Sequence, residues 1–170
     1  LAPTTSTTMM LVLGDVIALQ LMNKRGFKKE HFKKFHPGGM LGKSLLLVKD
    51  IMHTEDKLPL IKNHNTMREA LLKMTSYGFG CVGIINSKNH LIGIITDGDL
   101  RRNIAKKFLD LSIEKIMTKN PVTVEPKMNI KETIDIMNSN KITSVFVIKH
   151  NSKVPEGIIH IHDCIKIGEL

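Results

Sequence analysis

Gly93-Ile94-Ile95-Thr96-Asp97-Gly98-Asp99 is a short apolar run that ends in polar side chains, and an altered copy returns as Gly157-Ile158-Ile159-His160-Ile161-His162-Asp163. Each copy is typical of a buried strand that leads into the start of a helix. In α/β folds, ligands usually bind where strands end and helices begin. The sequence therefore indicates a duplicated unit whose strand ends are candidate binding positions.

The duplication extends on both sides of this motif. Each unit predicts the order strand, helix, strand, strand, helix. The first unit opens at 50–54, and its elements are expected at 58–61, around an apolar stripe of Met67, Ala70, Leu71 and Met74, and at 81–85, 91–95 and about 97–108. The second opens at 115–119, with elements at 121–124, around Ile130, Thr133, Ile134 and Met137, and at 144–148, 156–161 and about 162–167. Thr66 and Asn129 are expected to cap the first helix of each unit.

Composition limits the class of protein. The chain has 170 residues, of which 42% are hydrophobic, so it can bury one or two cores and is too apolar for general disorder. It contains no Trp and one Tyr, so those cores must be aliphatic. Its net charge of +9 favours anionic partners such as phosphates or nucleotides. Nucleic acid is not the expected partner, because the lysines are spread along the chain and few aromatic residues accompany them.

Cys81 and Cys164 each lie in an apolar run, so reduced core thiols are expected and not a disulfide, which favours a cytoplasmic location. No apolar run approaches the ~20 residues that span a bilayer, and the first residues lack a secretory signal pattern, so no membrane contact is expected. The chain begins with Leu1 and not with Met, and is therefore expected to be a piece of a longer protein or a product of processing.

Residues 1–48 lie outside the duplication. A hydroxyl cluster at residues 4–8 precedes the apolar stretch 9–25, which predicts a buried helix that Gly26 ends. Hydroxyls at a helix N-terminus can act as caps, or they can bind a phosphate, for which Thr4, Thr5 and Ser6 are the candidates. Because one apolar helix needs a covering surface, it must dock on the repeats, on a second chain, or on a domain body that this sequence lacks.

A basic segment at 27–35 is followed by His36-Pro37-Gly38-Gly39-Met40-Leu41-Gly42. Pro37 biases His36 toward an extended backbone, and the glycines allow tight turns. A histidine held by a stiff turn is a candidate acid or base, although many loop histidines have no such role.

The order of elements, the opening at 50–52 and the ending at 93–99 together resemble a tandem pair of cystathionine β-synthase (CBS) domains, a module that often binds adenine nucleotides. The fold that this resemblance implies is α/β, with α+β repeats at 49–110 and 111–170. Residues 1–8 and 36–42 resemble the end of the sugar isomerase (SIS) domain in D-arabinose 5-phosphate isomerases of the KpsF/GutQ type, so 1–48 would be a helical SIS remnant and linker.

This second resemblance implies that the chain is the C-terminal portion of an enzyme converting D-ribulose 5-phosphate to D-arabinose 5-phosphate for Kdo and lipopolysaccharide synthesis. His36 would be catalytic. The other catalytic residues would belong to the upstream part of the SIS domain, so this chain alone is expected to be inactive. The alternative from another class is a stand-alone module that senses a nucleotide and has no catalytic partner.

The CBS resemblance implies that Thr96 and Asp99 contact the phosphate and ribose of a nucleotide, although helix capping alone would also explain both residues. Arg101 and Arg102 could pair with phosphate. In the second unit Asp163 is retained, but His160 replaces the threonine. This departure argues against a second identical site and leaves one ligand, a sugar nucleotide or none as the alternatives.

His160 and His162 would share a face if both lay on a strand, which suggests a metal. The sequence offers no third or fourth ligand at suitable spacing, so packed or solvent-facing histidines and no metal are expected. No cofactor is required by this interpretation, and an adenine nucleotide or a CMP-sugar would be a regulatory ligand. Other expected partners are a sugar phosphate, bound with the upstream SIS portion, and further copies of the chain in a dimer or tetramer.

Overall fold

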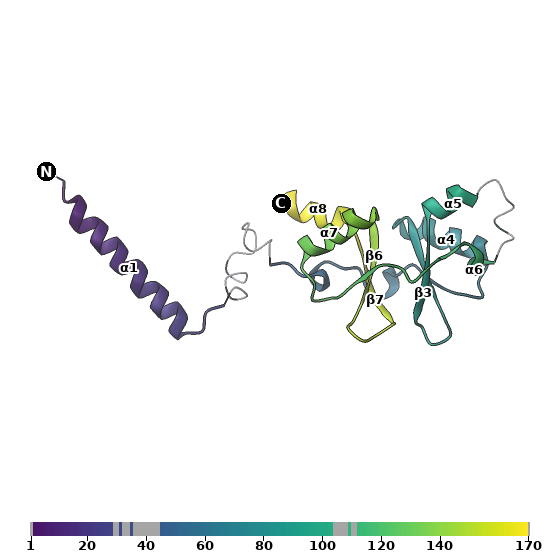
Figure 1. The fold of residues 1–170 in the computed structure, drawn as a ribbon, viewed down its shortest axis with the longest axis horizontal. Helices are drawn as coiled ribbons and strands as arrows, with labels where there is room; N and C mark the ends of the chain where they lie inside the picture. The colour runs from purple at the N-terminus through teal and green to yellow at the C-terminus, as the bar shows by residue number, and fades with distance from the viewer. Residues whose placement is uncertain are drawn as a thin grey trace. The chain divides into compact units, whose positions relative to one another are not determined.

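A computed structural model describes residues 2–28, 31, 35, 45–103, 109 and 112–169, and the chain divides into two compact units, Leu1–Leu45 and Leu46–Leu170 (Figure 1). His36 and the glycine-rich turn that follows it lie outside the described residues. The second unit contains both copies of the duplicated motif, so it is the unit that positions the candidate site.

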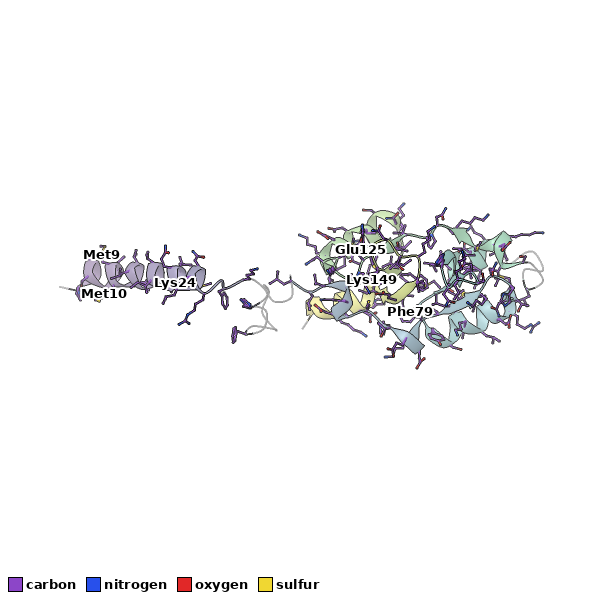
Figure 2. The ribbon with its side chains drawn as sticks, turned by 90° about the horizontal axis from the view of Figure 1, so that it is seen from below. Met9, Met10, Lys24, Phe79, Glu125 and Lys149 are labelled. Atoms are coloured by element: carbon purple, nitrogen blue, oxygen red, sulfur yellow. The ribbon has the colours of Figure 1, made fainter. Side chains whose placement is uncertain are left out.

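The first unit is built on α1 (Thr4–Lys24), none of whose residues is buried. The prediction of a buried helix is therefore wrong for this structure, in which Met9, Met10 and the neighbouring apolar side chains project freely (Figure 2). The helix also begins earlier than predicted, because the threonines continue it. The hydroxyls of Ser6 and Thr7 donate to the backbone carbonyl of Pro3 at 3.0 and 3.1 Å. These side chains therefore make their hydrogen bonds within the first turns of the helix.

α1 also corrects the expectation that no apolar run is long enough to span a bilayer. By length and composition alone it could cross a membrane, with a mean hydropathy of 1.4. Asp15 stands near its middle, where a carboxylate opposes insertion by about 2.5 to 3.5 kcal/mol.

The second unit contains two copies of the predicted order of elements, which confirms the α/β tandem architecture. The first repeat comprises β1 (Leu60–Lys62), α4 (Met67–Tyr77), β2 (Cys81–Ile85), β3 (Leu91–Thr96) and α5 (Asp97–Asn103). The second repeat comprises β5 (Thr123–Val124), α7 (Ile130–Asn140), β6 (Ser144–Ile148), β7 (Pro155–His160) and α8 (Ile161–Glu169). Among the described residues of this unit, four further short elements were not predicted: η1 (Val48–Asp50), η2 (Glu55–Lys57), α6 (Ile113–Ile116) and β4 (Thr118–Lys119).

The two repeats form separate sheets, in the orders β1-β2-β3-β4 and β5-β6-β7. In each sheet the first strand pairs in parallel with the second, and the second and third form an antiparallel hairpin. The predicted stripe on α4 is buried at Met67, Ala70 and Met74, and its fourth member, Leu71, is half-buried. The counterparts of the three buried residues on α7 are buried as well. These aliphatic faces attach each helix to its own sheet.

The predicted helix caps are also confirmed. The hydroxyl of Thr66 accepts from the backbone N–H of Glu69, whose carboxylate accepts from the backbone N–H of Thr66 at 2.7 Å. These hydrogen bonds lower the pKa of Glu69. The side chain of Asn129 accepts from the backbone N–H of Lys131 at 2.8 Å. Each cap satisfies an N–H group that the first turn of a helix leaves without a partner.

The segments that open the repeats are exchanged between them, which the sequence did not predict. The first opening segment, residues 46–53, packs on the second repeat: the backbone N–H of Val48 donates to the carbonyl of Met128 at 2.9 Å, and His53 pairs with Ile158 through two backbone hydrogen bonds. Val48 is fully buried in the core of the second repeat.

The second opening segment, residues 112–119, packs on the first repeat in the same manner. Ile113 and Ile116 are buried in its core, and β4 extends its sheet beside β3. A glycine makes room for a methionine of each opening segment. A Cβ on Gly93 would lie 2.5 Å from the sulfur of Met117, too close for both to fit. Gly157 makes the same space for Met52, at 2.6 Å. Each repeat is therefore completed by the segment that precedes the other.

The sheets meet at a third apolar cluster, which combines Phe79 and Cys81 with Phe146 and Ile158. Figure 1 shows the helices of the two repeats on the far sides of this junction, and Figure 2 labels Phe79 within it. The hydroxyl of Ser144 donates to the carbonyl of Phe79 at 2.7 Å and is buried. The junction is therefore closed by both packing and a buried polar contact.

The two cysteines are free and buried, as predicted. Burial raises the pKa of Cys81 to about 12 and that of Cys164 to about 11. At pH 8 the reactive thiolate would then make up no more than about 0.1% of either group, against roughly a quarter for a free thiol.

We expect both thiols of the folded chain to react with a disulfide reagent at least about 100-fold more slowly than those of the chain unfolded in guanidinium. The measurement is the release of the reagent's coloured leaving group, folded against unfolded. Equal rates in the two states would show that the thiols are not protected by the cores.

Candidate functional site

The first candidate site is the junction of β3 and α5. The backbone N–H and the hydroxyl of Thr96 both donate to one carboxylate oxygen of Asp99 at 2.8 Å. The second oxygen of Asp99 accepts from the guanidinium of Arg102 at 2.7 Å. Asp99 is only 5% exposed, so these three contacts satisfy and fix a buried carboxyl group. The predicted capping role of Thr96 and Asp99 is confirmed by these hydrogen bonds.

A cavity of about 600 Å³ opens against this junction. The first repeat contributes Phe79, Gly80, Cys81, Ile94, Thr96, Asp97, Gly98, Asp99, Arg101 and Arg102, and the remaining lining residues are 118, 120–122 and 141–144. It thus lies between the two repeats, and all four candidates proposed for the first strand end line it. Its volume is within the range of about 300 to 1,000 Å³ that is typical of small-molecule sites.

The side chains around this cavity combine three chemical functions. Thr96 offers a hydroxyl, Asp99 a carboxylate that can accept from sugar hydroxyls, and Arg101 and Arg102 positive charge for phosphate. Gly98 lines the cavity and adds no side chain to it. A Cβ placed at Gly98 would have a guanidinium nitrogen of Arg102 as its nearest neighbour, at 3.4 Å. This set of groups suits a phosphorylated, hydroxyl-bearing ligand.

The second strand end is arranged differently. Asp163 accepts from the backbone N–H of His160 at 3.2 Å and pairs with Nε2 of His53 at 3.0 Å. His53 belongs to the first opening segment, and its ring contacts that of Phe79 edge-on at a centroid distance of 5.1 Å. His53 was not predicted, because only the exchange of opening segments brings it to Asp163.

His160 and His162 do not share a strand face, so that expectation is corrected. β7 ends at His160 and His162 lies in α8, although the two rings still approach to 4.9 Å between centroids. Burial, followed by the neighbouring His162, lowers the pKa of His160. Within residues 2–28, 45–103 and 112–169 no group of three or more His, Cys, Asp or Glu side chains is arranged to hold a metal.

The remaining sequence candidates lie in the first unit. Thr4, Thr5 and Ser6 occupy the first turns of α1 and are exposed. His36 lies outside the part of the chain that the structure describes. The second-repeat wall of the cavity, including Lys141 and Thr143, was also missed. A repeat boundary in the sequence does not show which loops of the other repeat will face it.

Comparisons with known proteins agree with this architecture. The family model of the CBS domain matches residues 48–106 and 113–169. The chain is 42% identical over 171 aligned residues to arabinose 5-phosphate isomerase KdsD of Salmonella typhi. This alignment covers 99% of this chain and 52% of that protein, namely its C-terminal part. The chain therefore spans about half the length of the curated relatives it matches.

Solved structures show the same fold at low sequence identity. The CBS domain pair of protein MJ0100, in complex with 5'-methylthioadenosine and S-adenosyl-L-methionine, has a TM-score of 0.66 and 23% identity over 74% of this chain and 97% of that one. CBSX2 in complex with AMP has a TM-score of 0.61 and 18% identity over 72% of this chain and 96% of that one.

Proposed function

The chain belongs to the CBS domain family, and from this premise we propose that its paired repeats bind an adenine nucleotide or a sugar nucleotide in the cavity at the end of β3. The cavity of about 600 Å³ carries this proposal, because it brings the buried Asp99 together with Thr96, Arg101 and Arg102. Asp99 would accept from ribose hydroxyls, while Thr96 and the two guanidinium groups would contact phosphate.

The full-length protein, on this proposal, is a cytoplasmic arabinose 5-phosphate isomerase that assembles as a dimer or tetramer. The 42% identity to KdsD supports this assignment. Residues 1–48 would be the end of its SIS domain, where His36 takes part in catalysis and Thr4, Thr5 and Ser6 contact the sugar phosphate. The CBS pair, at 49–110 and 111–170, would regulate or assemble the enzyme, and the 170-residue chain alone would not turn over substrate.

The exposed face of α1 supports an upstream partner. Ten of its apolar side chains are among the exposed large hydrophobic residues: Met9, Met10, Leu11, Val12, Leu13, Val16, Ile17, Leu19, Leu21 and Met22. Such a surface needs to be covered in water. The rest of the SIS domain would cover it in the full-length enzyme.

Regulation would pass through residues 42–49, which separate the His36 loop from the first repeat in the sequence. A ligand that shifts the packing of the repeats would displace this segment and with it the turn that carries His36. Unchanged isomerase kinetics of the full-length enzyme at saturating nucleotide would remove this coupling from the proposal, while leaving nucleotide binding intact.

Binding can be tested by calorimetry with AMP, ATP and a CMP-linked sugar. We expect Gly98→Leu to weaken the ligand that binds by at least about tenfold, since its side chain would enter the cavity without a backbone clash. Gly14→Leu is the matched control, because a Cβ at Gly14 meets nothing within 4 Å. Equal affinity in both variants would place the ligand elsewhere, and no heat with any of the three compounds would oppose nucleotide binding.

A further inference from the structure

We propose that His53, His160 and His162 close the second strand end, so that each chain takes one nucleotide, at the end of β3. This inference rests on the proposed function, because it concerns how many copies of that ligand the paired repeats accept. It goes beyond that function by assigning three histidines, one of them on the first opening segment, as the residues that set the number.

The duplication allows the two strand ends to be compared position by position. The Asp99 end has small residues at three positions where the Asp163 end has imidazole rings. The corresponding pairs are Thr96 and His160, Gly98 and His162, and Thr118 and His53. Each replacement adds a ring where the first site is open, so the carboxylate is retained while the space beside it is reduced.

His53 pairs with the carboxylate of Asp163, which would otherwise accept hydrogen bonds from ribose hydroxyls. Its Nε2 lies 3.0 Å from an oxygen of Asp163, and its side chain is 29% exposed. Two backbone hydrogen bonds to Ile158, of 2.8 and 2.9 Å, hold the residue in place. Arg102, which pairs with Asp99 at the first site, has a side chain that is 69% exposed and can move aside.

His160, which is half-buried, and His162, which is exposed, lie beside Asp163. The backbone N–H of His162 donates to Nδ1 of His160 at 3.2 Å, so this N–H is already used. The pKa of His160 is lowered by burial and by His162, so the ring is neutral at neutral pH and supplies no positive charge for a phosphate. At the second strand end, imidazole rings thus take positions that small residues hold at the first, while Lys166 stands at the position of Arg102.

The cavities agree with this difference. Asp99 lines the cavity of about 600 Å³, whereas Asp163 does not line the smaller cavity beside His53. The cavity beside His53, of about 320 Å³, is lined by residues 52–57. Its wall carries two carboxylates, of Glu55 and Asp56, against one ammonium, of Lys57, a balance that disfavours a phosphate.

The wild-type 170-residue chain provides a first test that needs no substitution. In calorimetry with AMP at pH 7.5 we expect one ligand per chain. In amide NMR we expect AMP to shift the signals of Thr96 to Arg102 and to leave those of His160 to Cys164 in place. Two equivalents of AMP, or shifts at both strand ends, would overturn the inference while the proposed function stands.

Two reciprocal variants exchange the character of the strand ends. The triple variant His53→Thr, His160→Thr and His162→Gly should raise the stoichiometry from one to two. Gly98→His, which places a ring at the open position of the first site, should weaken AMP by at least about tenfold. Thermal unfolding with and without AMP establishes that each variant is folded.

A folded triple variant that still binds one AMP would overturn the inference and leave the proposed function standing. If the triple variant does not fold, the wild-type stoichiometry and the NMR shifts still decide. If no form binds AMP, ATP or a CMP-linked sugar, in a chain that unfolds cooperatively, the proposed function is opposed and the inference falls with it.

Discussion

Phe146→Ala should lower the free energy of unfolding of the Leu46–Leu170 unit by about 3 to 5 kcal/mol. Phe146 is fully buried and is the largest such side chain among the residues that the structure describes. Its ring belongs to the cluster that joins the two sheets, and its tip lies 2.7 Å from where a Cβ on Gly83 would stand. The truncation therefore removes aromatic contacts from both repeats and leaves a cavity between them.

Urea denaturation followed by circular dichroism measures this loss. Leu72→Ala is the control, since Leu72 is 63% exposed on α4 and its truncation should change the free energy of unfolding by less than about 0.5 kcal/mol.

Gly83→Ala alone should lower the free energy of unfolding by about 1 to 3 kcal/mol, because the new methyl group overlaps the ring of Phe146. In the double variant the two losses should fall short of additivity. Additive losses would show that Gly83 and Phe146 are not in contact.

Val48→Asp should cost more than about 3 kcal/mol, because it places a carboxylate at a fully buried position in an aliphatic core. Val48 lies before the first repeat in sequence but is packed in the second. Hydrogen exchange should therefore show the larger loss of protection in the β6–β7 hairpin and the smaller loss in β2–β3. A larger loss of protection in the second repeat is expected only if the opening segment of the first repeat packs on the second; a segment packed on its own repeat would give the larger loss in β2–β3.

Leu72→Asp serves as the control for Val48→Asp, because it introduces the same charge in place of an exposed leucine. We expect its effect to stay within about 0.5 kcal/mol. Loss of protection confined to β2–β3 in the Val48 variant would contradict the exchange of segments.

The periodic patterns in the sequence were sufficient to predict most of the second unit. β2 is buried at every position, as its continuous apolar run predicts, and the Met67, Ala70 and Met74 stripe fixes the face by which α4 packs. The Thr66 and Asn129 caps could also be predicted, because a residue type that caps helices stands directly before each apolar helical stripe. Thr96 and Asp99 could be singled out because a strand end and a helix start coincide there.

Other features depend on contacts between segments far apart in the chain. The opening segments look like the start of the repeat that follows them, and only the glycines at 93 and 157 show where Met117 and Met52 will pack. His53 could not be connected with Asp163 without that exchange. The predicted burial of α1 failed for a different reason: apolar density shows that a helix needs a cover and does not show that the cover belongs to the same sequence.

The exchanged opening segments also bear on how such a module could arise. A gene encoding a single repeat would produce a chain whose opening segment has no acceptor within the same molecule, because the segment docks on the other copy. Such a chain would fold as a domain-swapped homodimer. Duplication of that gene would join the two swapped halves covalently, after which each half could diverge. The histidines around Asp163 are the kind of substitution that this freedom permits.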